Sequence, residues 1–285
     1  MKIKKQFLVI VGVIPIACAG WLVPRAHAGA WTLEPGHMYA ELGSNFYWDN
    51  AEYNASGDKR PKPAQGSYDE VATKAYLEYG LIPRLNLISS IFYKRVVFTD
   101  DYSHLTNSGF QDGTLSLKWR FTGPESPIVF SGIVGTRFPL GYSTQRDPQL
   151  GTGDWNPEAR LSVGRTFMPM PVAADGTGWS RFYANAELAK DKRSLLSSLE
   201  GGYFPVSWLY AKGLLNGTWD CPSQPDGQQF YKWNFSLNLA SDGSGLITRQ
   251  GTKKSFTLSL GYGEIFHGRN VGAGSEWTTS VSMGF

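Results

Sequence analysis

The sequence predicts an all-β fold, a single transmembrane antiparallel β-barrel of twelve strands with both termini periplasmic. Three observations support this prediction: a signal-peptide pattern at the start, apolar and polar residues that alternate along the chain, and no run of 18 apolar residues after residue 28. An exported chain with a hydrophobic period of two and no apolar helix is typical of an outer-membrane barrel. A soluble β-protein is the other class open to such a chain.

Residues 1–28 are predicted to be a cleaved signal peptide, and residues 29–285 the barrel domain. Three lysines within the first five residues precede an apolar stretch over residues 7–17, which is too short to span a bilayer. A small-x-small motif then places the cleavage between Ala28 and Gly29.

Removal of the signal peptide changes the charge of the protein. It takes away four basic residues and no acidic one, which leaves 23 Lys and Arg against 24 Asp and Glu. The mature chain therefore has no excess of positive charge for binding nucleic acid, and no nucleic-acid partner is expected. It keeps Cys221 alone, which excludes an intrachain disulfide.

Alternation recurs in segments close to the 9–11 residues that a tilted membrane strand needs. In one of them, Tyr231, Trp233 and Phe235 interleave with Lys232 and Asn234. The predicted strands cover residues 37–48, 68–80, 85–98, 111–122, 127–138, 155–167, 179–190, 195–204, 208–219, 229–240, 254–265 and 276–285.

The connections between these strands differ in length on the two sides of the predicted barrel. Those at residues 81–84, 123–126 and 205–207 are tight, whereas those at residues 49–67 and 140–154 are long and polar. Outer-membrane barrels have this pattern, with the termini on the short-turn side. The departures from it are residues 168–178 and 241–253, long on the short side, and residues 190–194, short on the long side.

Aromatic residues lie near both ends of the predicted strands, as expected for rings at a membrane–water boundary. Near the long loops these are Trp48, Phe98, Phe138, Trp155, Trp219, Tyr231, Tyr262 and Trp277. Near the short turns they are Tyr79, Trp119, Phe121, Phe167, Trp179, Trp208 and Phe285.

The last strand accounts for the way the chain ends. Trp277, Val281 and Met283 alternate with polar residues up to the terminal Phe285. Their face is expected to contact outer-membrane lipid, and the strand to pair with the first one, so that no edge stays open. The terminal phenylalanine resembles the C-terminal signal of bacterial outer-membrane proteins. This resemblance implies recognition of Phe285 by the barrel-assembly machinery.

The same alternation directs charged residues of both signs into the lumen. Because a charge in a narrow lumen is costly unless it is paired, ladders of ion pairs are expected. Such pairs would either line an open channel or fill a packed barrel. The predicted lumen-lining residues are Glu41, Glu70, Lys74, Glu78, Lys94, Asp112, Lys118, Arg120, Arg137, Glu158, Arg160, Glu187, Glu200, Lys212, Lys232 and Glu276.

The midpoints of the connections predict which of these residues face one another, since opposed residues on one face of a sheet are close enough to pair. The expected pairs are Glu200 with Lys212, Lys94 with Asp112, and Arg137 with Asn156 or Glu158. Four apolar residues also fall on inward positions, either as apolar lining or as a sign of β-bulges: Ile88, Phe92, Ile133 and Leu214.

No catalytic, cofactor-binding or metal site is predicted. The mature histidines are His37, His104 and His267, and the last lies with an Asn and a Ser in the loop of residues 266–275. Those are residue types that a hydrolase uses. A flexible glycine-rich turn is the simpler interpretation of that loop. The sequence has no metal-ligand spacing and no nucleotide-binding fingerprint.

Two segments, LEYGLIPRLNL at residues 77–87 and GRNVGAG at residues 268–274, resemble the outer-membrane family labelled for the meta-pathway of phenol degradation. The resemblance implies a barrel and a role in the uptake of small compounds, aromatic ones among them. It transfers no binding residue. Related channels for hydrophobic compounds carry an N-terminal plug. Here the first predicted strand starts at residue 37, so no plug is expected.

The sequence thus predicts an outer-membrane passive channel for a small solute, with small aromatic or other organic compounds as candidates. Two alternatives stay open. One is a closed structural or binding barrel that acts through its outer loops, and the other is an outer-membrane lipid-modifying enzyme.

Overall fold

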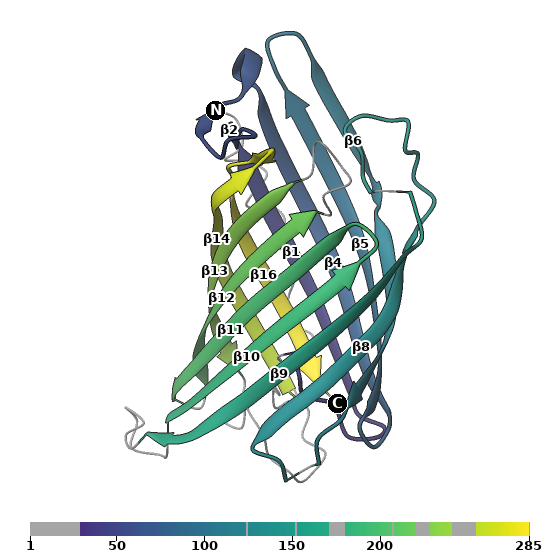
Figure 1. Ribbon diagram of the computed structural model, residues 1–285, viewed down its shortest axis with the longest axis vertical. Helices are drawn as coiled ribbons and strands as arrows, with labels where there is room; N and C mark the ends of the chain where they lie inside the picture. Colours follow the sequence, from purple (N-terminus) through teal and green to yellow (C-terminus); the bar gives the residue numbers. More distant parts are fainter. Residues whose placement is uncertain are drawn as a thin grey trace.

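Twelve strand positions close into one antiparallel barrel, which confirms the predicted fold class (Figure 1). The computed structural model describes residues 29–123, 125–151, 153–170, 180–206, 208–220, 228–240 and 255–284. No helix in this part of the chain is long and apolar enough to cross a membrane. The wall consists of β1 (Met38–Asp49), β4 (Ser67–Ile82), β5 (Leu85–Thr99), β7 (Asp112–Arg120), β8 (Ile128–Pro139), β9 (Asn156–Met170), β10 (Ser180–Asp191), β11 (Ser194–Val206), β12 (Leu209–Asp220), β13 (Gln229–Ala240), β14 (Ser255–Arg269) and β16 (Ser275–Gly284).

The first and last strands complete the barrel. β1 pairs with β16 on one side and with β4 on the other, which sets Leu42 opposite both Val281 and Ala75. β16 ends where β1 begins, at the end of the barrel marked C in Figure 1; we call this end the terminus end and the opposite one the loop end. Phe285 and Trp179 lie outside the described residues, as do residues 1–28 with the predicted signal peptide.

Side chains alternate between the lumen and the outer surface. On β13, Ser236 and Asn238 are buried, whereas Phe235, Leu237 and Leu239 are exposed on the outside. The outer face of the barrel is consequently an apolar band of the kind that lipid covers. Exposed rings border it near the loop end at Trp48, Trp155 and Trp277, and near the terminus end at Tyr79, Trp119, Phe121, Phe167 and Trp208.

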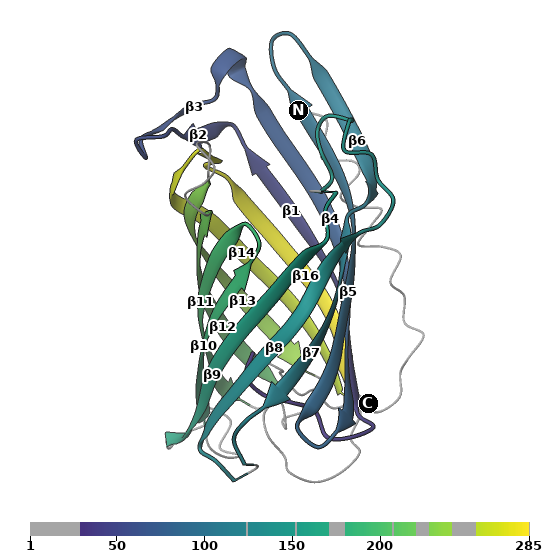
Figure 2. The ribbon, with the colours of Figure 1, turned by 45° about the vertical axis from the view of Figure 1, so that its right-hand side comes forward.

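One wall strand is interrupted where a loop was predicted. Residues 99–110 contain β6 (His104–Phe110). β6 pairs with the half of β5 nearer the loop end, and β7 pairs with the half of β5 nearer the terminus end. Gln111 joins the two and donates its backbone N–H to the carbonyl of Phe92 (2.8 Å). As a result β4, β5 and β6 rise beyond the other strands at the loop end (Figure 2).

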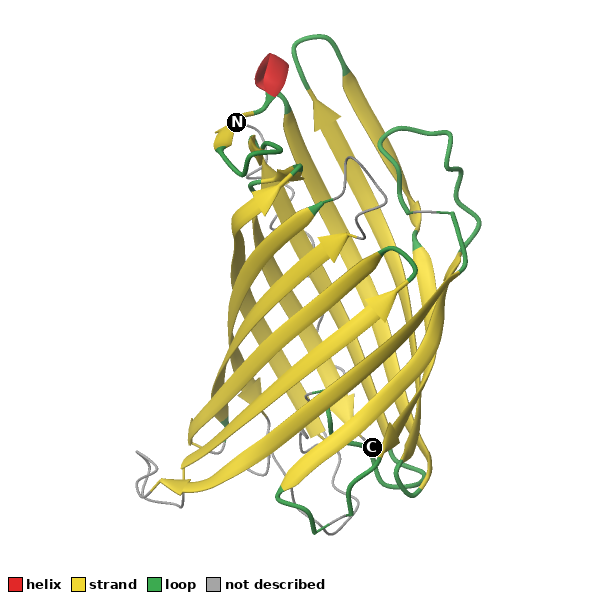
Figure 3. Cartoon of the chain, viewed as in Figure 1, coloured by secondary structure: helices red, strands yellow, loops and turns green. Residues whose placement is uncertain are grey.

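A small second sheet lies at the loop end. It contains β2 (Ala51–Tyr53), β3 (Lys59–Pro61) and β15 (Val271–Gly272), with a single helical turn, η2 (Pro63–Gln65), beside it (Figure 3). Tyr53, Ile265 and Ala273 form a buried core that attaches this sheet to β14. β14 itself continues to Arg269, so the predicted flexible turn at residues 266–269 is wrong, and strand pairing with β13 is the reason.

The residues before β1 fold back into the lumen, so the prediction of no plug is wrong. We call residues 29–36 the N-terminal segment. Ala30 and Leu33 in this segment are buried. Gly36 donates its backbone N–H to the carbonyl of Gly80 on β4 (2.8 Å), and Gly80 donates to the carbonyl of His37 (2.9 Å). Burial against the barrel wall and these backbone hydrogen bonds hold the segment in place.

Candidate functional site

Ion pairs inside the lumen connect different strands of the wall. In one of these pairs, Nζ of Lys118 on β7 lies 2.6 Å from Oε1 of Glu78 on β4, and the Glu78 carboxylate is fully buried. Lys232 contacts Glu276 at 2.5 Å, and Lys94 contacts Glu70 at 3.2 Å. The wall is therefore held together by compensated charges, which is the arrangement that a low-dielectric lumen requires.

Of the predicted opposed pairs, some are confirmed and others are wrong. Arg137 lies directly opposite Asn156, as expected. Glu200 lies opposite Leu214 and not opposite Lys212, because the turn centres between Val206 and Leu209 and shifts the register. Its carboxylate nevertheless reaches the Lys212 ammonium diagonally, at 3.6 Å.

The predicted pair of Lys94 with Asp112 is wrong. The interruption between β6 and β7 places Gly109 opposite Lys94, whose ammonium pairs with Glu70 of β4. Asp112 instead accepts a hydrogen bond from the Tyr142 hydroxyl in the loop after β8. Burial and the hydrogen bond to Asp112 raise the pKa of Tyr142 to about 12, so this hydroxyl stays protonated at neutral pH and holds the loop to β7.

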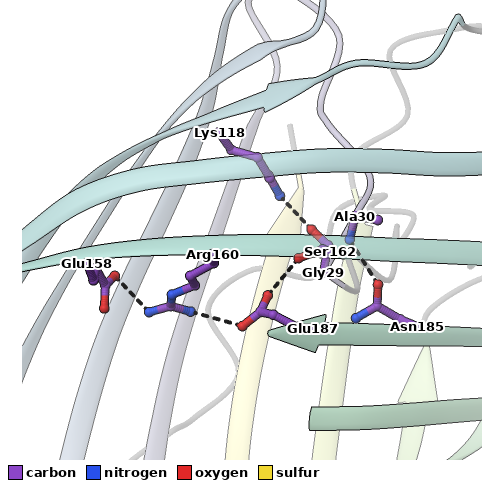
Figure 4. A network of polar contacts seen from close by, with 8 residues as sticks. All are labelled: Gly29, Ala30, Lys118, Glu158, Arg160, Ser162, Asn185 and Glu187. Atoms are coloured by element: carbon purple, nitrogen blue, oxygen red, sulfur yellow. Dashed lines mark hydrogen bonds and ion pairs between the residues drawn. The ribbon is translucent and has the colours of Figure 1, made fainter. Parts of the chain in front are cut away.

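The N-terminal segment occupies the lumen beside β7, β9 and β10 (Figure 4). The backbone N–H of Ala30 donates to Oδ1 of Asn185 (3.2 Å), and Lys118 donates to the carbonyl of Gly29 (3.4 Å). The Trp31 ring meets the ring of Tyr183 edge to face, with 6.2 Å between the ring centres. These contacts place backbone and an indole ring where an open channel would hold water.

Next to this segment, Arg160 bridges two strands. Its guanidinium binds Glu158 on its own strand at 2.8 Å and Glu187 on β10 at 3.4 Å, and Glu187 also accepts a hydrogen bond from Ser162 (2.9 Å) (Figure 4). Arg120 lies nearer the terminus end, where it donates to the carbonyl of Gly123 (2.8 Å). The predicted inward charges all lie within the described residues, and their role as lumen lining remains a proposal.

Tyrosine and acidic residues alternate on the inner faces of β1 and β4. On β1, Tyr39 donates to Glu41 (2.9 Å) and Tyr47 to Asp49 (2.9 Å). On β4, Tyr68 donates to Glu70 (2.7 Å) and Tyr76 to Glu78 (2.8 Å). The rings also meet across the two strands, Tyr39 with Tyr76 and Tyr47 with Tyr68. This repeat escaped the sequence analysis, although a tyrosine two residues before each acid is visible in the sequence.

A cavity of about 540 Å³ fills the part of the lumen beside β1, β4, β12, β13 and β16. Its charged lining consists of Glu41, Glu70, Lys74, Glu200, Lys212, Lys232 and Glu276. Hydroxyl and amide groups, such as those of Asn234 and Thr278, supply most of the remaining lining. Phe92 and Leu214 also line it, so their inward positions are apolar lining and not errors of register. The side chains of Ile88 and Ile133 are buried on the lumen side of the barrel wall.

The described residues give little geometry for catalysis. The His267 ring packs against Tyr53 and Tyr231, with ring centres 6.2 and 6.0 Å apart. His104 shares a hydrogen bond with the hydroxyl of Thr99 in the β5–β6 hairpin (2.9 Å). Within the described ranges, no group of three or more His, Cys, Asp and Glu residues is placed to hold a metal ion.

The chain is similar to solved outer-membrane barrels. It superposes on an outer membrane channel from Pseudomonas putida F1 with a TM-score of 0.65 and 14% identity, covering 90% of this chain and 98% of that one. The beta domain of the Bordetella autotransporter BrkA gives a TM-score of 0.47 and 10% identity, covering 88% of this chain and 99% of that one. No protein-family model and no curated protein matches the chain. At these identities, the likeness to the first channel shows the fold.

Proposed function

We propose that the protein is a passive channel for small solutes in the outer membrane. The observation that carries this proposal is the polar cavity of about 540 Å³ inside a closed barrel with an apolar outer band. A barrel filled by its own side chains leaves no such space. Because the N-terminal segment occupies the neighbouring part of the lumen, the pathway is narrow beside β7 and β10.

The loop end faces the outside of the cell and the terminus end faces the periplasm. The tight β4–β5 turn, the start of β1 and the end of β16 all lie at the terminus end of the barrel, as expected for the periplasmic side. Lipid covers the apolar band, and the barrel-assembly machinery recognises the terminal strand with Phe285.

The mature protein is expected to begin at Gly29 and to fractionate with the outer membrane, because the Ala28 site matches signal-peptidase cleavage. Intact-mass measurement of the protein from separated membranes checks both points. Recovery of a full-length chain from the inner membrane would refute the proposed processing and location.

The proposed solutes are small organic compounds, aromatic ones included. The family resemblance of residues 77–87 and 268–274 supports this class, and so do the aromatic and aliphatic side chains in the cavity wall. A closed barrel acting through its loops is the competing function. It predicts that the purified protein conducts no ions in planar bilayers. We propose no enzymatic role, since the His267 ring is packed between tyrosine rings.

Trp31→Ala is expected to increase single-channel conductance, because it removes the ring that fills the lumen against Tyr183. Trp155→Ala is the matched control, since it removes an indole exposed at the loop end. Recordings in planar bilayers compare the two variants with the wild type. If neither wild type nor Trp31→Ala conducts, the closed-barrel function replaces the channel.

A further inference from the structure

We propose that the lumen cavity contains a carboxylate-binding site at Lys74, and that the channel favours small carboxylates with a compact apolar body. This inference rests on the proposed channel function and names its solute class. It arises from Lys74, the one cavity-lining ammonium group that has no ion pair among the described residues.

Lys74 differs from the other cationic groups of the cavity. Lys212 and Lys232 each have a carboxylate oxygen within 4.0 Å, and so does Lys94 on β5. In the described part of the chain, Lys74 has no such ion pair, and its ammonium lies over the ring of Tyr76, 4.7 Å from the ring centre. An ammonium group inside a barrel without a paired anion is costly, and a bound carboxylate would offset that cost.

Charged groups of both signs act on Lys74 from other strands of the barrel. Glu41 on β1 attracts it most strongly, and Lys212 on β12 and Arg160 on β9 both repel it. The carboxylate of Glu41 already accepts the hydroxyl of Tyr39. Glu70, Glu200 and Glu276, the other acids of the cavity, are bound to lysines. An anion between the walls would relieve the repulsion and receive charge-assisted hydrogen bonds.

Apolar groups lie next to this ammonium. Phe92 on β5 is the direct cross-strand partner of Lys74 and lines the same cavity. Leu214 lines it from β12. By the alternation of the sequence, Phe92 and Leu214 are both apolar residues on a polar inner face. Together with Lys74 they form an amphipathic wall that suits a carboxylate attached to an aromatic ring or a branched hydrocarbon.

The size of the cavity fits such a solute. Pockets for small molecules span about 300–1,000 Å³ and combine apolar walls with a few placed polar groups. The cavity has about 540 Å³ and offers the ammonium of Lys74, an aromatic ring and amide groups such as that of Asn234. A metal or nucleotide would need a different set of ligands.

The test uses benzoate as probe, with acetate, benzyl alcohol and benzylamine as comparisons. Concentration-dependent reduction of the potassium chloride current by the mature protein in planar bilayers gives the apparent affinity. Benzoate is expected to bind more tightly than each of the other three, because it alone has both the carboxylate and the ring. Lys74→Gln is expected to weaken benzoate binding about tenfold, the effect of losing one charge-assisted hydrogen bond.

Arg137→Gln is the matched control. It also removes a positive charge from an inner position of the wall, but Arg137 does not line the cavity. It is expected to leave the benzoate affinity within about twofold, and Lys74→Arg to retain most of it, since both keep a cation at position 74. Phe92→Ala is expected to weaken benzoate and leave acetate unchanged.

Equal losses in Lys74→Gln and Arg137→Gln would overturn the site, since the effect would then be a general field of the lumen. Equal affinities for benzoate and benzylamine would overturn the proposed solute class. Calorimetric titration of the detergent-solubilised protein with benzoate measures the site without conduction. Binding that depends on Lys74 in a protein that conducts nothing would therefore uphold the site and refute the channel.

Discussion

Glu78→Gln is expected to destabilise the barrel by about 3–5 kcal/mol, because removing one partner of a buried ion pair leaves the other charge uncompensated. Side chains of Lys118 and Glu78 are only 4% and 1% exposed, and their charged atoms are 2.6 Å apart. Glu78 also accepts the hydroxyl of Tyr76 and the amide of Asn86. Urea unfolding of the protein in lipid vesicles measures the free energy difference.

The control for this prediction is Glu52→Gln. Glu52 pairs with Arg60 at 2.8 Å in the small sheet at the loop end, where the two side chains are 26% and 55% exposed. Exposed pairs contribute about 0–1 kcal/mol. A loss in Glu78→Gln no larger than that in Glu52→Gln would show that the lumen near Glu78 is well hydrated, contrary to the burial described here.

Leu237→Arg is expected to destabilise the protein by about 2–4 kcal/mol, the cost of arginine on the lipid face near the bilayer midplane. Leu237 is 50% exposed on the outside of β13 and lies opposite Leu260 of β14, which is 57% exposed. Leu117→Arg on β7 is expected to behave in the same way, since Leu117 is also exposed outside. Unfolding in lipid vesicles gives both values.

Asn234→Arg on the same strand provides the comparison for the inner face. Asn234 lines the cavity and donates to Glu276 (3.4 Å), so an arginine there finds room and a carboxylate. It is expected to cost clearly less than Leu237→Arg. Equal costs on the two faces would contradict a barrel with lipid outside and water inside.

The wall could be predicted from sequence because each strand has a period of two that a membrane barrel imposes along its whole length. β6 escaped because it is short and its residues, from Leu105 to Gly109, are mainly polar and small. β6 exists through its pairing with β5, which is a tertiary contact. The predicted register of Glu200 and Lys212 was wrong for a related reason, because the register depends on where the turn after β11 is centred.

The lumen could be predicted only in part. Parity along the strands gave the charged residues, but not the order in which the strands bring them together, as the pairing of Lys118 with Glu78 across β5 shows. The N-terminal segment has no periodic pattern at all. Its position depends on contacts between Trp31 and Tyr183, and between Ala30 and Asn185, which are far apart in the sequence.

Those distant contacts have a consequence for the order of folding. Ala30 binds a residue 155 positions later in the chain, and β1 pairs with β16 to complete the wall. Contacts of such long sequence separation form late, because the loop between them must first be closed. The N-terminal segment can therefore enter its place only after β9 and β10 stand side by side. Until then the nascent barrel has a wider interior than the finished one, and the segment that narrows the lumen is among the last parts to settle.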